Sequence, residues 1–268
     1  MIKIRTAVIL CGGKGTRLGL IGKKTAKTLI HVQKKPILWY ILNQLILKYN
    51  FNHIILPLGY KGKMIKSYIA KNSLSPKIKI EKVKFDLVET GLNTDISKRI
   101  LSVYNEITTD HFLLLNGDAI FDFSLGNFYE EHVKKNLDLS MITCEVRSPF
   151  GVVILKKNKP VNFKRDMEYN SIYSSKKNIF GEIFTGMSII KKSLLKKNKL
   201  KKYDNFELSF YPKILKSCKT YKIQTKKVNG FWYAMDDLKQ VELANSSKNK
   251  NFIYDKIQSI QKKINDTK

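Results

Sequence analysis

The sequence predicts an α/β protein with a Rossmann-like, mostly parallel sheet and helices on both faces. In the first half of its 268 residues, short apolar runs alternate with segments of helical periodicity. Strand, helix and strand in alternation are typical of a doubly wound sheet. One of the apolar runs is followed by a glycine-rich loop, and another is followed by a short motif that ends in an aspartate. Because ligands bind beyond the carboxyl ends of the strands in such sheets, we expect these motifs to form one site.

Strands in the first half are predicted by apolar runs that stop at turn residues. The run from Thr6 to Leu10 stops at a pair of glycines, and the run from His53 to Leu58 is closed by Gly59. One of the helices between them is expected after Pro36, because proline suits a first helical turn. The expected strands are 6–10, 53–58, 77–85 and 112–115, and the expected helices are 36–48, 63–71 and 96–104.

The second half is richer in predicted strands and contains no repeat and no Pro/Gly-rich linker. We therefore expect one domain over residues 1–245 and a basic C-terminal tail over 246–268, in which 251–264 forms a peripheral helix. The aromatic run 231–233 begins the last core segment. Strands are expected at 139–146, 150–155, 183–190 and 220–225, and helices near 126–135 and 206–217.

The charge balance is strongly basic, with 50 lysines and arginines against 22 acidic residues and a net charge of +28. Such a balance raises nucleic acid as a partner. Only five of the basic residues are arginines, however, and the reading of bases relies on arginine. The dense run from Lys191 to Lys202 is expected to be a solvated face, with contact to an acidic partner as the alternative. We expect no nucleic-acid partner, and a positive field that attracts nucleotides and sugar phosphates.

Membrane and secretion signals are not apparent in the sequence. The longest apolar run, Ile37 to Leu42, has six residues, whereas a spanning helix needs about twenty. The apolar stretch near the start is too brief for a signal peptide. Three cysteines, odd in number and far apart, support neither a disulfide framework nor a zinc site. We expect a reduced, cytoplasmic protein with no membrane partner.

The first chemical motif follows the first strand and reads Leu10-Cys11-Gly12-Gly13-Lys14-Gly15-Thr16-Arg17-Leu18. Its glycines would allow backbone N–H groups to approach a phosphate chain closely. Arg17 lies where a guanidinium could bridge two phosphates. The spacing matches neither the P-loop nor the dinucleotide-binding pattern. A purely structural turn is the alternative reading of this loop.

Three further residues carry chemistry that suits the same site. Lys27 lies ten residues after Arg17, Asp118 ends an apolar strand, and Asp236 follows the aromatic segment 230–235. A strand-end carboxylate suits Mg²⁺, which takes one or two carboxylates together with the phosphates of a substrate. Taken alone, each has a simpler reading: an exposed lysine, an aspartate in a turn, and a helix N-cap.

In this order the four motifs resemble those of the sugar-phosphate nucleotidyltransferase family, over residues 6–245. That family has a Gly-Gly-x-Gly-Thr-Arg-Leu loop after its first strand, a loop lysine, a strand-end Gly-Asp, and a later aromatic segment with a second acidic residue. Segment 230–236 is similar to the glucose-1-phosphate cytidylyltransferases of the family, and 35–39 and 59–62 support this. The resemblance implies that residues 1–245 are the catalytic domain.

The resemblance implies a role for each matching residue. The glycine-rich loop would cradle the nucleotide, Arg17 would hold its β- and γ-phosphates, and Lys27 would contact the α-phosphate. These two cations are the implied catalytic residues. Asp118 and Asp236 would bind Mg²⁺ as the cofactor. The implied nucleotide-binding residues are Leu10, Gly12, Gly13, Gly15, Thr16, Arg17, Lys27, Thr90, Gly91 and Arg99.

The chain departs from the family's pattern mainly on the acceptor side. The prolines that flank the loop lysine are replaced by Ala26 and Thr28. The lysine that would hold the acceptor phosphate is replaced by Asp166, and the Asn-Gly-Gly of the sugar pocket reads Phe-Thr-Gly at 184–186. We therefore predict an acceptor other than glucose 1-phosphate. The implied acceptor-binding residues are Phe184, Thr185, Lys164 and Arg165.

The implied activity is Mg²⁺-dependent nucleotidyl transfer. A sugar-phosphate oxygen, or that of a similar small phosphorylated acceptor, would attack the α-phosphorus of a nucleoside triphosphate, with CTP favoured, and pyrophosphate would leave. The product would be a CDP-activated metabolite for polysaccharide or related synthesis. GTP is the alternative, because Leu-Asn-Gly-Asp at 115–118 followed by Phe121-Asp122 also occurs in guanylyltransferase-like relatives. A second alternative is a protein that binds the nucleotide without turning it over. A homo-oligomer is left open.

Overall fold

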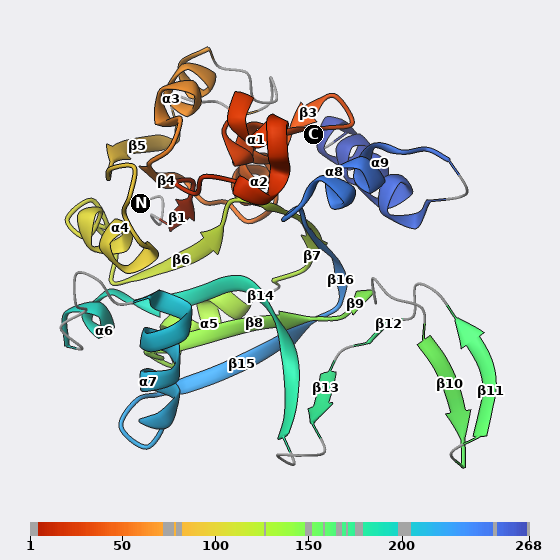
Figure 1. Cartoon of the computed structure of the whole chain (residues 1–268). Helices are drawn as coiled ribbons and strands as arrows, with labels where there is room; N and C mark the ends of the chain where they lie inside the picture. The colour runs from red at the N-terminus through yellow and green to blue at the C-terminus, as the bar shows by residue number, and fades with distance from the viewer. Residues whose placement is uncertain are drawn as a thin grey trace.

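The computed structural model describes most of the chain (Figure 1). The described residues are 5–71, 78, 82–125, 127–147, 152–157, 159–164, 168–169, 171–174, 179–197, 205–248 and 251–266. Within them, only the backbone is described at 147, 164, 168–169, 171–174, 179–180 and 197.

A mixed but mostly parallel sheet organises the fold, as predicted. Strand β1 lies between β4 and β6 and is parallel to both, and β5 continues the parallel arrangement beyond β4. On the other side, β14 is antiparallel to β6 and to β8, while β15 is parallel to β8. The strand order is β15-β8-β14-β6-β1-β4-β5. Its strands are β1 (Thr6–Leu10), β4 (His53–Leu58), β5 (Lys84–Glu89), β6 (His111–Asn116), β8 (Leu139–Cys144), β14 (Ile179–Lys191) and β15 (Ile223–Val228).

Helices cover both faces of this sheet, which is why alternate residues of its central strands enter different clusters. In β6, Leu113 and Leu115 belong to one buried cluster, whereas Phe112 and Leu114 belong to the other. The helices are α1 (Gly19–Lys24), α2 (Ile37–Asn43), α3 (Gly62–Ala70), α4 (Ile96–Ser102), α5 (Phe128–Lys134), α6 (Lys192–Lys197), α7 (Tyr211–Lys216), α8 (Leu238–Asn245) and α9 (Phe252–Asp266). A π-helical turn extends α2 over Gln44–Lys48, and another, over Phe206–Phe210, precedes α7.

Several short strands lie off the main sheet. A hairpin of β10 and β11 extends away from the body of the molecule (Figure 1). The short strands off the sheet are β2 (His31–Val32), β3 (Lys35–Pro36), β7 (Ala119–Phe123), β9 (Val146–Arg147), β10 (Val152–Lys156), β11 (Lys159–Lys164), β12 (Glu168–Tyr169) and β16 (Gly230–Ala234). Strand β13 (Ser171–Ser174) instead pairs with β14 of the main sheet. The strand expected at 150–155 therefore belongs to a hairpin and not to the sheet; residues 150–151 lie outside the described part.

The strand expected at 77–85 is displaced toward the C-terminus. Residues 78, 82 and 83 are described and are not in a strand, and β5 begins at Lys84. The partner strand explains this difference, because the parallel ladder with β4 starts at His53 opposite Lys84. Alternating Lys and Ile residues indicated a strand in the sequence but could not indicate this register.

The C-terminal helix α9 is not peripheral, contrary to expectation. Its isoleucines recur at helical spacing and enter the same buried cluster as helix α2, and α9 packs beside α8 (Figure 1). The division of the chain at residue 245 stays a prediction. The buried isoleucines are Ile253, Ile257, Ile260 and Ile264.

Part of the lysine run at 191–202 also contributes to the fold. Leu194 and Leu195 of α6 are fully buried, and the Lys192 ammonium donates a 2.6 Å hydrogen bond to the Ile107 carbonyl. The end of the run, 198–202, lies outside the described residues. Among the residues that are described, no helix has both the length and the apolar character needed to cross a bilayer.

The packing of α9 gives a direct stability prediction. Replacing the fully buried Ile257 by Ala should lower the free energy of unfolding by about 2–5 kcal/mol, because it removes buried methylenes and leaves a cavity. The exposed neighbour Gln258 is the matched control, and Gln258→Ala should change the free energy of unfolding by no more than about 0.5 kcal/mol. Urea unfolding followed by circular dichroism measures both. Equal effects of the two substitutions would show that α9 is not part of the core.

Candidate active site

The carboxyl ends of β1 and β6 bring the first two motifs together. These strands pair in parallel, with Leu10 opposite Asn116, so that the glycine-rich loop and Asp118 leave the sheet at the same edge. At Gly15 the backbone is left-handed, with φ of 61°, a conformation that glycine adopts without strain. The 3-10 helix η1 (Thr16–Leu18), which carries Arg17, begins at this turn.

Beneath the loop, the buried guanidinium of Arg99 ties three strand ends together. It donates to the Gly12 carbonyl at 3.0 Å, to the Thr90 hydroxyl at 2.6 Å and, more weakly, to the Leu58 carbonyl at 3.4 Å. Gly12 and Gly59 pack so closely on it that a Cβ at either position would lie 2.2 Å from one of its atoms. Arg99 therefore supports the loop from below, and its described bonds are internal to the protein.

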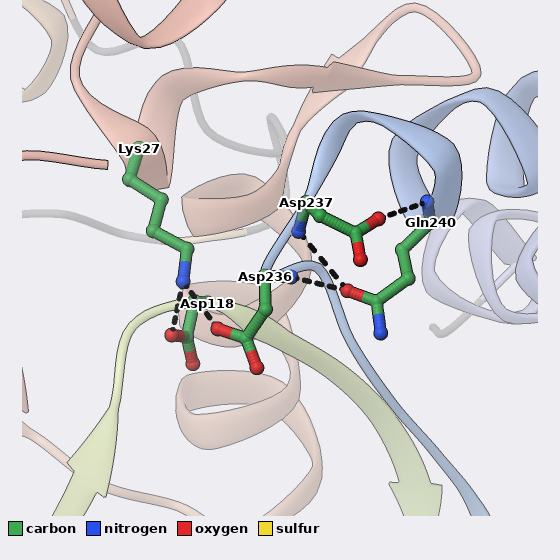
Figure 2. A network of polar contacts seen from close by, with 5 residues as sticks. All are labelled: Lys27, Asp118, Asp236, Asp237 and Gln240. Carbon is green, nitrogen blue, oxygen red and sulfur yellow. Dashed lines mark hydrogen bonds and ion pairs between the residues drawn. The ribbon is translucent and has the colours of Figure 1, made fainter. Parts of the chain in front are cut away.

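Lys27, Asp118 and Asp236 meet at one point, although they come from three distant parts of the chain. The Lys27 ammonium lies 2.7 Å from Asp118 Oδ2 and 2.7 Å from Asp236 Oδ1 (Figure 2). Lys27 begins the 3-10 helix η2 (Lys27–Leu29), Asp118 follows β6, and Asp236 follows β16. Burial alone lowers the pKa of Lys27, but the two carboxylates more than offset this and raise the pKa above its usual value. The side chain is therefore a cation at neutral pH.

Backbone pairing fixes the two aspartates relative to each other. Strand β16 is antiparallel to β7, which directly follows Asp118, and Ala119 lies opposite Ala234. One step further along, the Met235 amide donates a 2.9 Å hydrogen bond to the Asp118 carbonyl. Asp236 therefore reaches the edge of the sheet at the level of Asp118.

The adjacent aspartates 236 and 237 have different roles in the structure. Asp237 is the N-cap of α8 and forms a capping box with Gln240, whereas Asp236 faces Lys27 (Figure 2). The Gln240 side chain also accepts a 2.6 Å hydrogen bond from the Asp236 amide. Sequence reasoning missed Gln240, although Asp-x-x-Gln before a helix is a recognisable capping signal.

A cavity of about 340 Å³ lies above these groups. It is bounded by the glycine-rich loop, the Lys27 segment and the two aspartates. Sequence reasoning did not assign three of its lining residues, Cys11, Thr28 and Gly117. The lining residues are Leu10, Cys11, Gly13, Gly15, Thr16, Arg17, Lys27, Thr28, Gly117, Asp118 and Asp236.

Other residues implicated by the sequence lie beside or below this cavity. Gly12, Thr90 and Arg99 are beneath it, and Gly91, with φ of 91°, follows Thr90 at the end of β5. The Lys164 side chain, Arg165 and Asp166 lie outside the described part.

The Cys11 thiol in the cavity wall is unreactive at neutral pH. Burial raises the pKa of Cys11 to about 12, so the thiol stays protonated, and only a thiolate is a strong nucleophile. The chemistry of the cavity therefore depends on its cations and carboxylates.

Phe184 lines a small recess of about 10 Å³ that shares Leu10 with the main cavity. Its ring packs edge-on against Tyr211, with 5.6 Å between the ring centres. Thr185 is engaged in the fold instead: its hydroxyl donates to the Ile142 carbonyl, and its carbonyl accepts a 3.0 Å hydrogen bond from the Trp232 indole. The recess is thus walled by an aromatic side chain beside the cavity.

The paired carboxylates suit a hard divalent cation in number and chemistry. Asp118 and Asp236 present oxygens to a single point at the edge of the cavity, which is the donor set that Mg²⁺ uses together with phosphate oxygens and water. Within the described residues, no cluster of three or more His, Cys, Asp or Glu side chains offers a fuller set of ligands. An oxygen-rich ligand such as a phosphate would therefore strengthen the binding of a cation here.

Comparison with known proteins identifies the family. Residues 6–165, more than half of the chain, match the family model described as nucleotidyl transferase. The chain belongs to the sugar-phosphate nucleotidyltransferase family. The resemblance inferred from the four motifs is thereby confirmed, and the protein is a nucleotidyltransferase.

Relatives in this family carry names that differ in the nucleotide. The chain is 32% identical over 180 residues to a "Probable glucose-1-phosphate cytidylyltransferase" from Bacillus subtilis, across 62% of this chain and 70% of the relative. It is 27% identical over 209 residues to D-glycero-alpha-D-manno-heptose 1-phosphate guanylyltransferase from Aneurinibacillus thermoaerophilus, across 77% of this chain and 84% of the relative.

A solved structure supports the same fold. HddC from Yersinia pseudotuberculosis, crystallised in complex with GMP-PN, aligns with a TM-score of 0.64 at 21% identity, across 90% of this chain and 98% of that chain. The predicted α/β fold of this nucleotidyltransferase is thereby confirmed.

The close packing of Arg99 under the loop predicts that neighbouring glycines respond differently to substitution. Gly12→Ala should lower the free energy of unfolding by about 1–3 kcal/mol, because the new Cβ collides with the guanidinium. At Gly13 a Cβ meets nothing within 4 Å, and Gly13→Ala should change the stability by no more than about 0.5 kcal/mol. Thermal unfolding without ligand measures both. If the two variants unfolded alike, Arg99 would not support the loop.

Proposed function

We propose that this nucleotidyltransferase is Mg²⁺-dependent and joins a nucleoside triphosphate, CTP in the first instance, to a sugar phosphate or similar small phosphorylated acceptor, releasing pyrophosphate. The observation that carries the proposal is the meeting of Lys27 with Asp118 and Asp236 at a cavity bounded by the glycine-rich loop and Arg17. The product would be a nucleoside-diphosphate-activated metabolite.

The loop and the two cations suit a triphosphate. Gly13 and Gly15 expose backbone to the cavity, so N–H groups can approach phosphate oxygens closely. Arg17, exposed at the cavity wall, is placed for the β- and γ-phosphates, and Lys27 for the α-phosphate. Thr90 and Arg99 contribute indirectly, because they hold the loop.

Members of the family typically depend on Mg²⁺, and the carboxylates of Asp118 and Asp236 are the groups that would hold it. Bound there, the ion would neutralise phosphate charge and orient the triphosphate. The chain's own contribution is positional. Lys27 and Arg17 stabilise the negative charge that develops on the transferring phosphate, and the fixed loop holds the α-phosphorus in reach of the acceptor.

The bond changes are those of an in-line displacement. An acceptor phosphate oxygen forms a bond to the α-phosphorus while the bond from that phosphorus to the bridging oxygen of the β-phosphate breaks. Pyrophosphate leaves with the bonding electrons. Such a step needs positioning and charge neutralisation more than covalent help from the protein.

CTP is favoured over GTP on two grounds. The Bacillus subtilis relative is named for cytidylyl transfer, and segment 230–236 of this chain is similar to that branch of the family. The Aneurinibacillus relative is named for guanylyl transfer, and the sequence feature that favours GTP is Leu-Asn-Gly-Asp at 115–118 followed by Phe121-Asp122. In the structure Asp122 binds Lys48 and Lys263 at 2.7 Å each and is absent from the cavity lining. Asp122 therefore gives the GTP alternative no support from the geometry of the cavity.

The acceptor side supports a substrate other than glucose 1-phosphate. Phe184 offers a ring where relatives in the family offer an amide to a sugar hydroxyl, and Tyr211 holds that ring in place. Because an aromatic side chain cannot replace the hydrogen bond, the preferred acceptor should present an apolar or altered group to this wall. Lys164 and Arg165 stay proposed contacts for its phosphate.

The altered acceptor side also keeps a binding-only protein as the second candidate. The experiment that separates the two measures pyrophosphate release with Mg²⁺, each of the four nucleoside triphosphates, and a panel of sugar 1-phosphates and other metabolite phosphates. Release with one pair supports the proposed enzyme. No pyrophosphate release with any pair, while CTP still raises the Tm of the protein, supports the binding-only candidate.

Asp118 gives the sharpest test by substitution. Asp118→Asn should lower turnover about a hundredfold or more, because it removes one of two proposed metal carboxylates. Asp122→Asn is the matched control, since Asp122 is also paired with lysine but lies outside the cavity lining, and it should retain turnover. Steady-state kinetics with the active pair measure both. An Asp118→Asn enzyme as active as the control would remove Asp118 from the metal site.

Phe184 gives a test of acceptor choice. Phe184→Asn should raise kcat/KM for glucose 1-phosphate about tenfold, because it restores an amide that can bond a sugar hydroxyl. The KM for the nucleotide should stay unchanged, which serves as the internal control. If glucose 1-phosphate gained nothing, or the nucleotide KM moved equally, Phe184 would not set the acceptor.

A further inference from the structure

Lys27 is the most buried of the three charged side chains that meet at the edge of the cavity. The Lys27 side chain is 16% exposed, against 25% for Asp118 and 48% for Asp236, and its ammonium lies between their two carboxylates. The oxygens that face it, Asp118 Oδ2 and Asp236 Oδ1, are thereby already engaged with a positive charge. Two carboxylates and one ammonium leave a net charge of only −1 at this point.

A divalent ion at the same oxygens would have to share them with Lys27. The ammonium and the ion would then be two cations within a few ångströms in a partly buried site, where repulsion between charges is stronger than in water. A carboxylate can be shared between cations, but each cation then weakens the binding of the other. Lys27 in its observed position therefore opposes metal binding.

The Lys27 side chain can also leave that position without disturbing the fold. Its backbone is held in η2, where the Leu29 amide donates a hydrogen bond to the Ala26 carbonyl and the Ile30 amide donates one to the Lys27 carbonyl. The neighbouring Thr28 is buried. The side chain is a flexible stem with a compact charge, and the cavity adjoins it directly. The ammonium can move from the carboxylates toward a phosphate in the cavity while the backbone stays in place.

We propose that Lys27 is the internal counter-ion of the metal site, and that Mg²⁺ gains both carboxylates only when a triphosphate draws the ammonium away. This inference rests on the proposed function, because it takes a nucleoside triphosphate as the incoming ligand. It goes beyond a contact of Lys27 with the α-phosphate. Metal affinity becomes conditional on nucleotide, so the free protein binds the ion weakly.

The test measures metal binding to the full-length protein without nucleotide, with Mn²⁺ as the probe, by electron paramagnetic resonance. Lys27→Met should bind Mn²⁺ about ten- to a hundredfold more tightly than the unaltered protein, because one neighbouring positive charge is gone. Lys27→Arg keeps the charge and should bind as weakly as the unaltered protein. Lys24→Met is the matched control, an exposed lysine in the same segment, and should change nothing.

Two further variants control for misfolding and for metal binding at other residues. Lys27→Gln also lacks the charge and serves if Lys27→Met does not fold. Adding Asp118→Asn to Lys27→Met should abolish the gain, which assigns it to these carboxylates. As a second readout, MgCl₂ alone should raise the Tm of Lys27→Met but not that of the unaltered protein, because a ligand that binds the folded state stabilises it. Equal Mn²⁺ affinity in Lys27→Met and the unaltered protein would overturn the proposal.

A separate measurement tests whether a nucleotide draws Lys27 away from the carboxylates. Added CTP should raise the Mn²⁺ affinity of the unaltered protein toward that of Lys27→Met, with Asp118→Asn as the blank for metal bound by CTP itself. If CTP bound and left this affinity unchanged, the exchange would be wrong. No turnover is measured in these experiments. A failed pyrophosphate assay beside tighter Mn²⁺ binding by Lys27→Met would therefore count against the proposed function and not against the counter-ion role.

Discussion

Strands β7 and β16 come from different halves of the chain, and their pairing is the contact on which the site depends. The register places Ala119 opposite Ala234, and the next backbone bond joins the Met235 amide to the Asp118 carbonyl. Asp118 and Asp236 thus arrive at one point without any direct bond between their side chains, and Lys27 binds both. A slip of one residue in this pairing would carry Asp236 away from the level of Asp118 and separate the pair.

The glycine-rich loop is held in place from below. One guanidinium, that of Arg99, bonds the ends of three neighbouring strands, and glycine at 12 and 59 is what allows it to pack there. The loop above it is therefore fixed before any ligand binds. Rigid placement of a triphosphate is what nucleotidyl transfer requires, because the reaction gains most of its rate from orientation and charge neutralisation. The movable part is the Lys27 side chain, which can exchange two carboxylates for a phosphate.

The central sheet could be predicted from local signals, and the meeting of Lys27 with two aspartates from the order of the motifs and the family resemblance. Glycines that close apolar runs indicated β1 and β4, and the order of the motifs grouped Lys27 with the two aspartates. Long-range packing was not predictable. The isoleucines of α9 have helical spacing, but nothing local indicates that they pack near α2. Likewise, the sequence does not reveal that Arg99 points beneath the loop, since that depends on space left by two distant glycines.

If this cavity transfers a nucleotidyl group, the α-phosphorus of the triphosphate moves to the acceptor and the β- and γ-phosphorus leave together. We would incubate CTP, and then each of the other three nucleoside triphosphates, labelled at either the α- or the γ-phosphorus, with Mg²⁺ and a panel of sugar 1-phosphates. The α-label should appear on the acceptor in a product resistant to phosphatase, while the γ-label should leave in pyrophosphate. Transfer of the γ-label to the acceptor, or no transfer of α-label from any of the four nucleoside triphosphates, would show that the cavity does not transfer a nucleotidyl group.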